Sequence, residues 1–64
     1  RQYLAQTRKA LAELPDRTRI AFEMHRLGDK TIQEVADELG VSTSRAWKLI
    51  RNGYRHLLTR VDDF

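Results

Sequence analysis

Five polar residues near the carboxyl end of the chain share one side of an α-helix, if about 100° separates successive residues. They are Ser44, Lys48, Arg51, Asn52 and Arg55. Arg and Lys side chains pair with guanine, Asn pairs with adenine, and cations and hydroxyl groups contact phosphate oxygens. The types and spacing of these residues therefore predict a helix face that contacts double-stranded DNA.

Two short motifs predict where the helices that position this face begin and end. Thr31 and Glu34 have the spacing of a capping box, in which each side chain accepts a hydrogen bond from the other residue's backbone N–H. The helix that begins there is expected to end at Gly40, and Ser42 is expected to cap the next helix. We therefore expect a short helix, a tight turn and a longer helix.

The apolar residues around this turn have the pattern of a helix-turn-helix. Ala36 is small where the two helices are expected to cross closely, and Val41 beside Gly40 can fill the gap between them. The expected seam consists of Val35, Leu39, Ala46 and Leu49. A common helical hairpin with a glycine turn is the alternative, but the coincidence of these features favours DNA binding.

The first half of the chain predicts two more helices. Leucines over residues 4–14 share one face of a helix that ends at Pro15. Gly28 is expected to close the second helix in the left-handed conformation. The apolar residues at i, i+4 and i+7 of that second helix are Ile20, Met24 and Leu27. Since no segment alternates with period two, we predict an all-α, four-helix domain over residues 1–64 with a C-terminal helix-turn-helix.

The composition excludes several classes of function. The chain has 64 residues, with twelve Lys or Arg, nine Asp or Glu and no Cys, so disulfide scaffolds and thiolate metal sites are excluded. His25 and His56 are expected to be isolated surface or helix-end residues. No nucleophile elbow, phosphate loop, metal-ligand spacing or carboxylate pair is present. We therefore expect no enzyme activity, no cofactor and no metal.

The same composition bears on location and assembly. No apolar run approaches the about 18 residues that cross a bilayer, and the start lacks the apolar centre of a signal peptide. We expect a cytoplasmic protein without membrane insertion and, since no spare dimerisation helix is present, a monomer. Because the sequence begins at Arg1, we expect a fragment of a longer protein.

Individual contacts follow from the expected position of the fourth helix. Lys48, Arg51 and Asn52 are predicted to reach bases. Trp47 borders this face and is expected either to contact a thymine methyl or a sugar, or to be a partly buried core residue or a protein contact. The predicted phosphate contacts lie near helix N-termini and further along the last helix: Lys30, Thr31, Ser42, Thr43, Ser44 and Arg55. A solvated charge is the alternative for Arg55.

The third helix carries three acidic residues and no basic one. Only its N-terminus needs to approach DNA, so we expect Lys30 and Thr31 to meet a phosphate. Asp37 and Glu38 are expected to lie further from the strand. The alternative is that these acids simply form a solvated face.

The chain resembles region 4 of bacterial sigma-70-type sigma factors, and within it the extracytoplasmic-function group. Residues 14–22 are similar to the family's Leu-Pro-x-x-x-Arg-x-x-Phe segment, residues 31–39 to its first helix-turn-helix helix, and residues 40–42 to its turn. The run of residues 17–27 is most similar to the iron-starvation, FecI-type subgroup.

The resemblance implies an alternative sigma factor whose recognition helix binds the −35 promoter element, in this subgroup at promoters of iron-uptake genes. It also implies a grip on the β-subunit flap of the RNA polymerase core. The family's base-contacting positions correspond to Trp47, Lys48, Arg51 and Asn52. Arg45 and Ala46 stand where the family commonly has Thr and Val, and Trp47 where it has a basic residue. These departures bear on which bases the helix recognises and not on the expected fold.

Two alternatives belong to other classes. The same domain is bound in the family by anti-sigma or transmembrane regulatory proteins, for which exposed apolar residues of the first two helices offer a surface. A helix-turn-helix regulator of another family is the second alternative, and the missing dimerisation helix argues against it.

Overall fold

The computed structural model describes the backbone of residues 2–60 and the side chains of residues 5–60. Within this range the chain forms four helices and no strand, which confirms the predicted all-α class: α1 (Gln2–Ala12), α2 (Asp16–Arg26), α3 (Ile32–Leu39) and α4 (Thr43–Arg60). None of these described helices has the combined length and apolarity that would carry it across a membrane.

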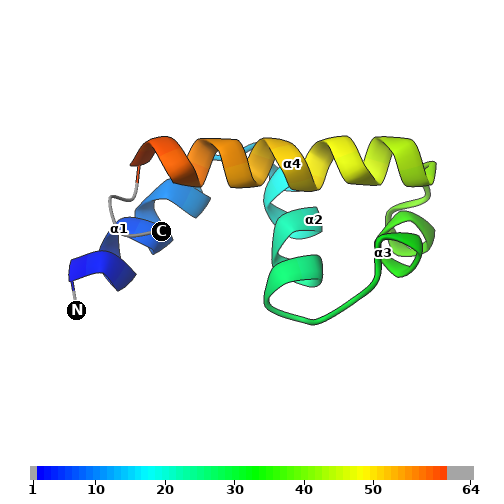
Figure 1. Cartoon of the computed structure of the whole chain (residues 1–64), viewed down its shortest axis with the longest axis horizontal. Coiled ribbons are helices and arrows are strands. Elements are labelled where there is room, and N and C mark those ends of the chain that lie inside the picture. Colours follow the sequence, from blue (N-terminus) through cyan, green and yellow to red (C-terminus); the bar gives the residue numbers. More distant parts are fainter. Residues whose placement is uncertain (1, 61–64) are drawn as a thin grey trace.

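The long helix α4 organises the other three helices. It runs along the 34 Å length of the molecule, with α1 beside its C-terminal part, α3 beside its N-terminal part and α2 between them (Figure 1). A helix of 18 residues spans about 27 Å, so α4 alone nearly sets the length of the domain. Each shorter helix buries its apolar side against a different stretch of α4.

The core consists of two clusters along α4. The larger cluster joins α2, α3 and α4, and its buried residues are Ala21, Val35, Ala36, Ala46, Leu49 and Ile50. The smaller cluster joins α1, α2 and α4 through Ala10, Phe22 and Leu57. The expected seam of the helix-turn-helix is confirmed, with Leu39 only partly buried at its edge.

α2 approaches α4 closely at Gly53. A Cβ atom at this position would lie 2.9 Å from both Cβ and Cδ1 of Phe22. The Phe22 ring also packs edge to face on Tyr54, with 5.0 Å between ring centroids. Glycine inside a helix costs about 1 kcal/mol relative to alanine. The close crossing explains why the helix carries a glycine there.

The buried face of α2 differs from the predicted one. Of the predicted residues, Met24 packs against the larger core cluster, but Ile20 is 37% exposed and Leu27 is 68% exposed, so the i, i+4, i+7 pattern marks the core side only in part. The buried residues are Thr18, Ala21 and Phe22. Because Thr18 and Ala21 are small, α2 can approach its neighbours closely. The Phe22 ring packs on Tyr54 and Leu57 of α4.

The helix ends of the first half also differ from expectation. α1 ends at Ala12, and Pro15 is the N-cap of α2, with its carbonyl accepting from the Arg19 N–H at 2.9 Å. The left-handed residue after α2 is Asp29, with φ of 55°, and not Gly28. Glycine is needed at position 28 for a different reason, because a Cβ there would lie 2.9 Å from the Met24 carbonyl oxygen.

Candidate nucleic-acid interface

The turn between α3 and α4 follows the sequence prediction in detail. Thr31 Oγ1 accepts from the Glu34 N–H at 3.1 Å, and Glu34 Oε1 accepts from the Thr31 N–H at 2.8 Å, which confirms the capping box. Gly40 ends α3 in the left-handed conformation, with φ of 68°. Ser42 Oγ accepts from the Arg45 N–H at 3.1 Å and so caps α4. Local hydrogen bonds therefore define both helix boundaries.

The two helices are held together by the residues expected at their crossing. Ala36 is buried, and its carbonyl accepts from the Val41 N–H at 3.0 Å. The Val41 side chain packs against the larger core cluster. This arrangement joins the turn to the core, so the orientation of α4 relative to α3 is fixed by packing.

The polar face of α4 points away from this core. Its five predicted residues are all exposed: Ser44, Lys48, Arg51, Asn52 and Arg55. The buried residues on the opposite side of the helix are Ala46, Leu49, Ile50, Gly53 and Leu57. Among the side chains of residues 5–60, no salt bridge engages Lys48, Arg51 or Arg55. The structure thus brings three exposed cations and an amide onto one accessible surface.

Trp47 lies at the edge of this surface. It is 46% exposed, whereas its neighbour Ala46 is fully buried. About half of this side chain is therefore accessible to a ligand that approaches α4, and the rest is covered by the fold.

The N-terminal end of α3 holds a different electrostatic arrangement. Lys30 Nζ lies 2.9 Å from Glu38 Oε2, an ion pair that the sequence did not predict. The hydrogen bond to Glu38, with the charge of that carboxylate, raises the pKa of Lys30. Hydrogen bonds from the Thr31 backbone and side chain lower the pKa of Glu34. Lys30 is therefore already paired in the absence of DNA.

Both histidines have hydrogen-bond partners within the fold, and His25 lies in the last turn of α2, as expected for a helix-end residue. His25 Nδ1 donates to the Lys30 carbonyl at 2.9 Å and ties the end of α2 to the start of α3. His56 Nε2 donates to Glu13 Oε1 at 2.9 Å, and Arg60 donates to Glu13 Oε2 at 2.8 Å. Glu13 lies 43 positions before His56, so no local sequence pattern announces this cluster.

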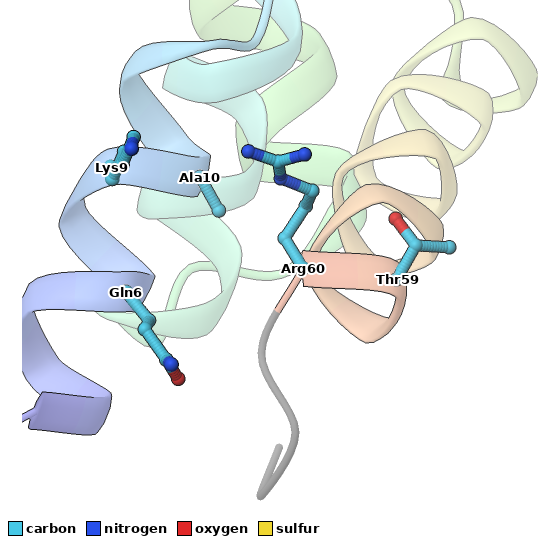
Figure 2. A pocket seen from close by; sticks show the side chains of 5 residues that line it. All are labelled: Gln6, Lys9, Ala10, Thr59 and Arg60. Atoms are coloured by element: carbon cyan, nitrogen blue, oxygen red, sulfur yellow. The ribbon is translucent and has the colours of Figure 1, made fainter.

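Two hollows lie away from α4's polar face. The smaller one, of about 230 Å³, is lined by Gln6, Lys9, Ala10, Thr59 and Arg60. Figure 2 shows that Gln6 and Thr59 point in different directions, so the polar groups do not converge on one ligand position. The larger one, of about 410 Å³, is an open groove between α1 and α2, lined by Arg8, Leu11, Ala12, Asp16, Arg19 and Glu23. Within the described residues, no group of three potential metal ligands comes together.

Comparison with known proteins gives one finding. The family model described as "Sigma-70, region 4" matches residues 4–57. No curated protein and no solved structure matches the chain. The matched segment extends from α1 through the helix-turn-helix into the last turns of α4.

Proposed function

Because the chain belongs to the sigma-70 region 4 family, we propose that the polar face of α4 reads the −35 promoter element through Trp47, Lys48, Arg51 and Asn52. Region 4 is a non-enzymatic domain by which a sigma factor binds this element and RNA polymerase in transcription initiation. The observation that carries the residue assignment is the exposure of this face directly after the helix-turn-helix turn.

Each proposed base contact follows from side-chain chemistry. Lys48 and Arg51 donate to guanine O6 and N7, and the Asn52 amide pairs with adenine N6 and N7. Trp47 packs its exposed indole face on a thymine methyl or a sugar. A good bidentate contact contributes about 1–3 kcal/mol of discrimination between bases.

The proposed phosphate contacts flank these residues. Hydroxyl groups and free N–H groups at the start of α4 suit phosphate oxygens, and a cation about three turns further along can hold the same strand. At α4 these residues are Ser42, Thr43, Ser44 and Arg55, and at the start of α3 they are Lys30 and Thr31. The Ser42 hydroxyl accepts from the Arg45 N–H and keeps its own hydrogen for a phosphate.

Selection of duplexes from a randomised library tests the assignment. The wild-type chain, bound to RNA polymerase core, is expected to enrich one short motif. Lys48→Ala and Arg51→Ala are each expected to relax the preference at one or two positions of that motif. Lys9→Ala is the matched control, because it removes the same charge from α1. An unchanged motif in both α4 variants would refute the assignment.

For the polymerase, we propose that the β-subunit flap docks in the groove between α1 and α2. The support is that two apolar residues, Leu11 and Ala12, line this groove together with charged residues of both signs. Ala12→Glu fills the groove from an exposed position and is expected to weaken binding to core polymerase at least tenfold. DNA binding by the free chain is expected to change less than twofold. Equal loss of both activities would contradict a separate flap site.

We further propose that the chain belongs to the extracytoplasmic-function group and to its iron-starvation subgroup. The support is the resemblance of residues 17–27 to that subgroup. Chromatin immunoprecipitation of the protein from iron-starved cells is expected to recover promoters of iron-uptake genes. Recovery of unrelated promoters only would refute the subgroup.

An anti-sigma or transmembrane regulatory protein is the second candidate partner. The observation that favours it is the exposure of Ile20 and Leu27 on α2, which the core does not use. The double variant Ile20→Ser, Leu27→Ser is expected to lose inhibition by such a regulator while it keeps promoter binding. Retained inhibition would place the regulator elsewhere.

A further inference from the structure

We propose that Glu38 lowers the affinity of this domain for DNA by holding the Lys30 ammonium group away from the phosphate backbone. The inference rests on the proposed phosphate contact of Lys30 beside Thr31. It adds a residue that sets the strength of promoter binding without touching DNA.

The ion pair joins Lys30, which precedes α3, to a carboxylate from the last turn of that helix. Lys30 precedes the N-cap Thr31, yet its Nζ lies 2.9 Å from Oε2 of Glu38, the second-last residue of the helix. Glu38 follows Thr31 by seven positions, so the backbones of the two residues lie about 10 Å apart along the helix axis. The ammonium group is therefore engaged by a carboxylate from the C-terminal part of α3, while it also feels the charge of Glu34, whose carboxylate accepts from the N-cap N–H.

The backbone of Lys30 is held by hydrogen bonds, so only its side chain can move the ammonium group. Its N–H donates to the Met24 carbonyl at 3.0 Å, and its carbonyl accepts from His25 Nδ1 at 2.9 Å. The side chains of Lys30 and Glu38 are 40% and 50% exposed. Rotation of a surface lysine can thus move the ammonium group between the carboxylate and the helix N-terminus without opening the core.

The Glu38 carboxylate and a DNA phosphate carry like charges, so they compete for the Lys30 ammonium group. A phosphate that recruits the lysine weakens the pair with Glu38, and the net gain in affinity is reduced by the strength of that pair. Exposed ion pairs shift an equilibrium by up to about fivefold. The expected effect of removing Glu38 lies in that range.

The first test is Glu38→Ala, because alanine neither pairs with Lys30 nor accepts a hydrogen bond from it. The probe is the duplex that the wild-type chain selects, and binding is measured by fluorescence anisotropy from 50 to 200 mM KCl. We expect about threefold tighter binding at low salt. We also expect the slope of log affinity against log salt to steepen by about 0.9, as for one additional phosphate contact.

Asp37→Ala is the matched control. It removes the same charge from the adjacent position, but Asp37 accepts from Gln33 Nε2 and does not pair with Lys30. It is expected to raise affinity less and to leave the slope unchanged. Equal gains and equal slopes for the two variants would show that Glu38 acts only as a general negative charge and would overturn the proposal.

Lys30→Met in both backgrounds separates this inference from the function on which it rests. We expect a small loss of affinity in the wild type and a larger loss in Glu38→Ala, with the steeper slope abolished. Equal losses in both backgrounds would overturn the role of Glu38 and keep the phosphate contact. No loss in either background would refute the phosphate contact itself. Circular dichroism checks that all variants remain folded.

Discussion

The two halves of α4 use their polar side chains in opposite ways. In the N-terminal half, Lys48 and Arg51 are exposed, and no salt bridge among the side chains that the structure describes engages them. In the C-terminal half, His56 and Arg60 both hold Glu13, which follows α1. Basic residues on a helix therefore do not by themselves indicate a DNA-binding surface. A better indication is whether those residues are already paired within the fold.

The apolar sides of the two halves differ as well. The N-terminal half packs on α3 through the helix-turn-helix seam, and the C-terminal half packs on α1 and α2 around Phe22 and Leu57. One continuous helix thus couples a surface that faces outward to a part that holds the domain together. Substitutions in the two halves are expected to separate DNA binding from stability.

The largest expected effect is on stability and comes from Gly53→Val. The new side chain would overlap Phe22, since even its Cβ would lie 2.9 Å from that ring. Overpacking of this kind costs about 1–3 kcal/mol in the free energy of unfolding. Urea denaturation followed by circular dichroism measures it. The control Asn52→Val places the same side chain on the exposed side, and an equal loss there would show that crossing at Gly53 does not limit the fold.

The next effect distinguishes two arginines of the same helix. Arg51→Ala is expected to weaken promoter binding by about 2 kcal/mol, within the range for a specific base contact, and to leave unfolding unchanged. Arg60→Ala removes the same charge from the paired half, and its effect on DNA affinity is expected to be small. Anisotropy titrations with the selected duplex compare them. Equal losses of affinity would remove the distinction between the halves.

The smallest effect concerns the cluster around Glu13. Glu13→Gln weakens its pairs with His56 and Arg60 and is expected to lower the free energy of unfolding by about 1 kcal/mol or less, because these groups are partly exposed. The matched variant Glu23→Gln loses a single pair of 3.7 Å to Arg19 and is expected to have a smaller effect. Thermal melts at one pH compare the two. A larger loss for Glu23→Gln would contradict the structural role of the Glu13 cluster.

The sequence predicted the helix-turn-helix well because its signals are local. A capping box, a left-handed glycine and a serine cap each involve residues within a few positions of one another, and Thr31, Gly40 and Ser42 behave as expected. The exposure of α4's polar face also followed from helical periodicity. Such features need no knowledge of the partner helices.

The features that the sequence did not predict depend on which helices meet. α2 buries Thr18 and exposes Leu27, because its neighbours require small side chains at the crossing. The left-handed residue after α2 is Asp29. Gly28 instead lies so close to the Met24 carbonyl oxygen that a Cβ atom would not fit there. The one available signal of the close crossing was a glycine inside a helix, at position 53.

We propose that residues 42–55 contact DNA, while the polar side chains at the end of α4, His56 and Arg60, serve the fold by pairing with Glu13. Amide chemical-shift mapping during titration with the selected duplex tests it most directly. The account predicts the largest shifts over residues 42–55 and at Lys30 and Thr31, with small shifts around Glu13 and Arg60. Shifts concentrated in α1 and α2, with residues 44–52 unchanged, would contradict it.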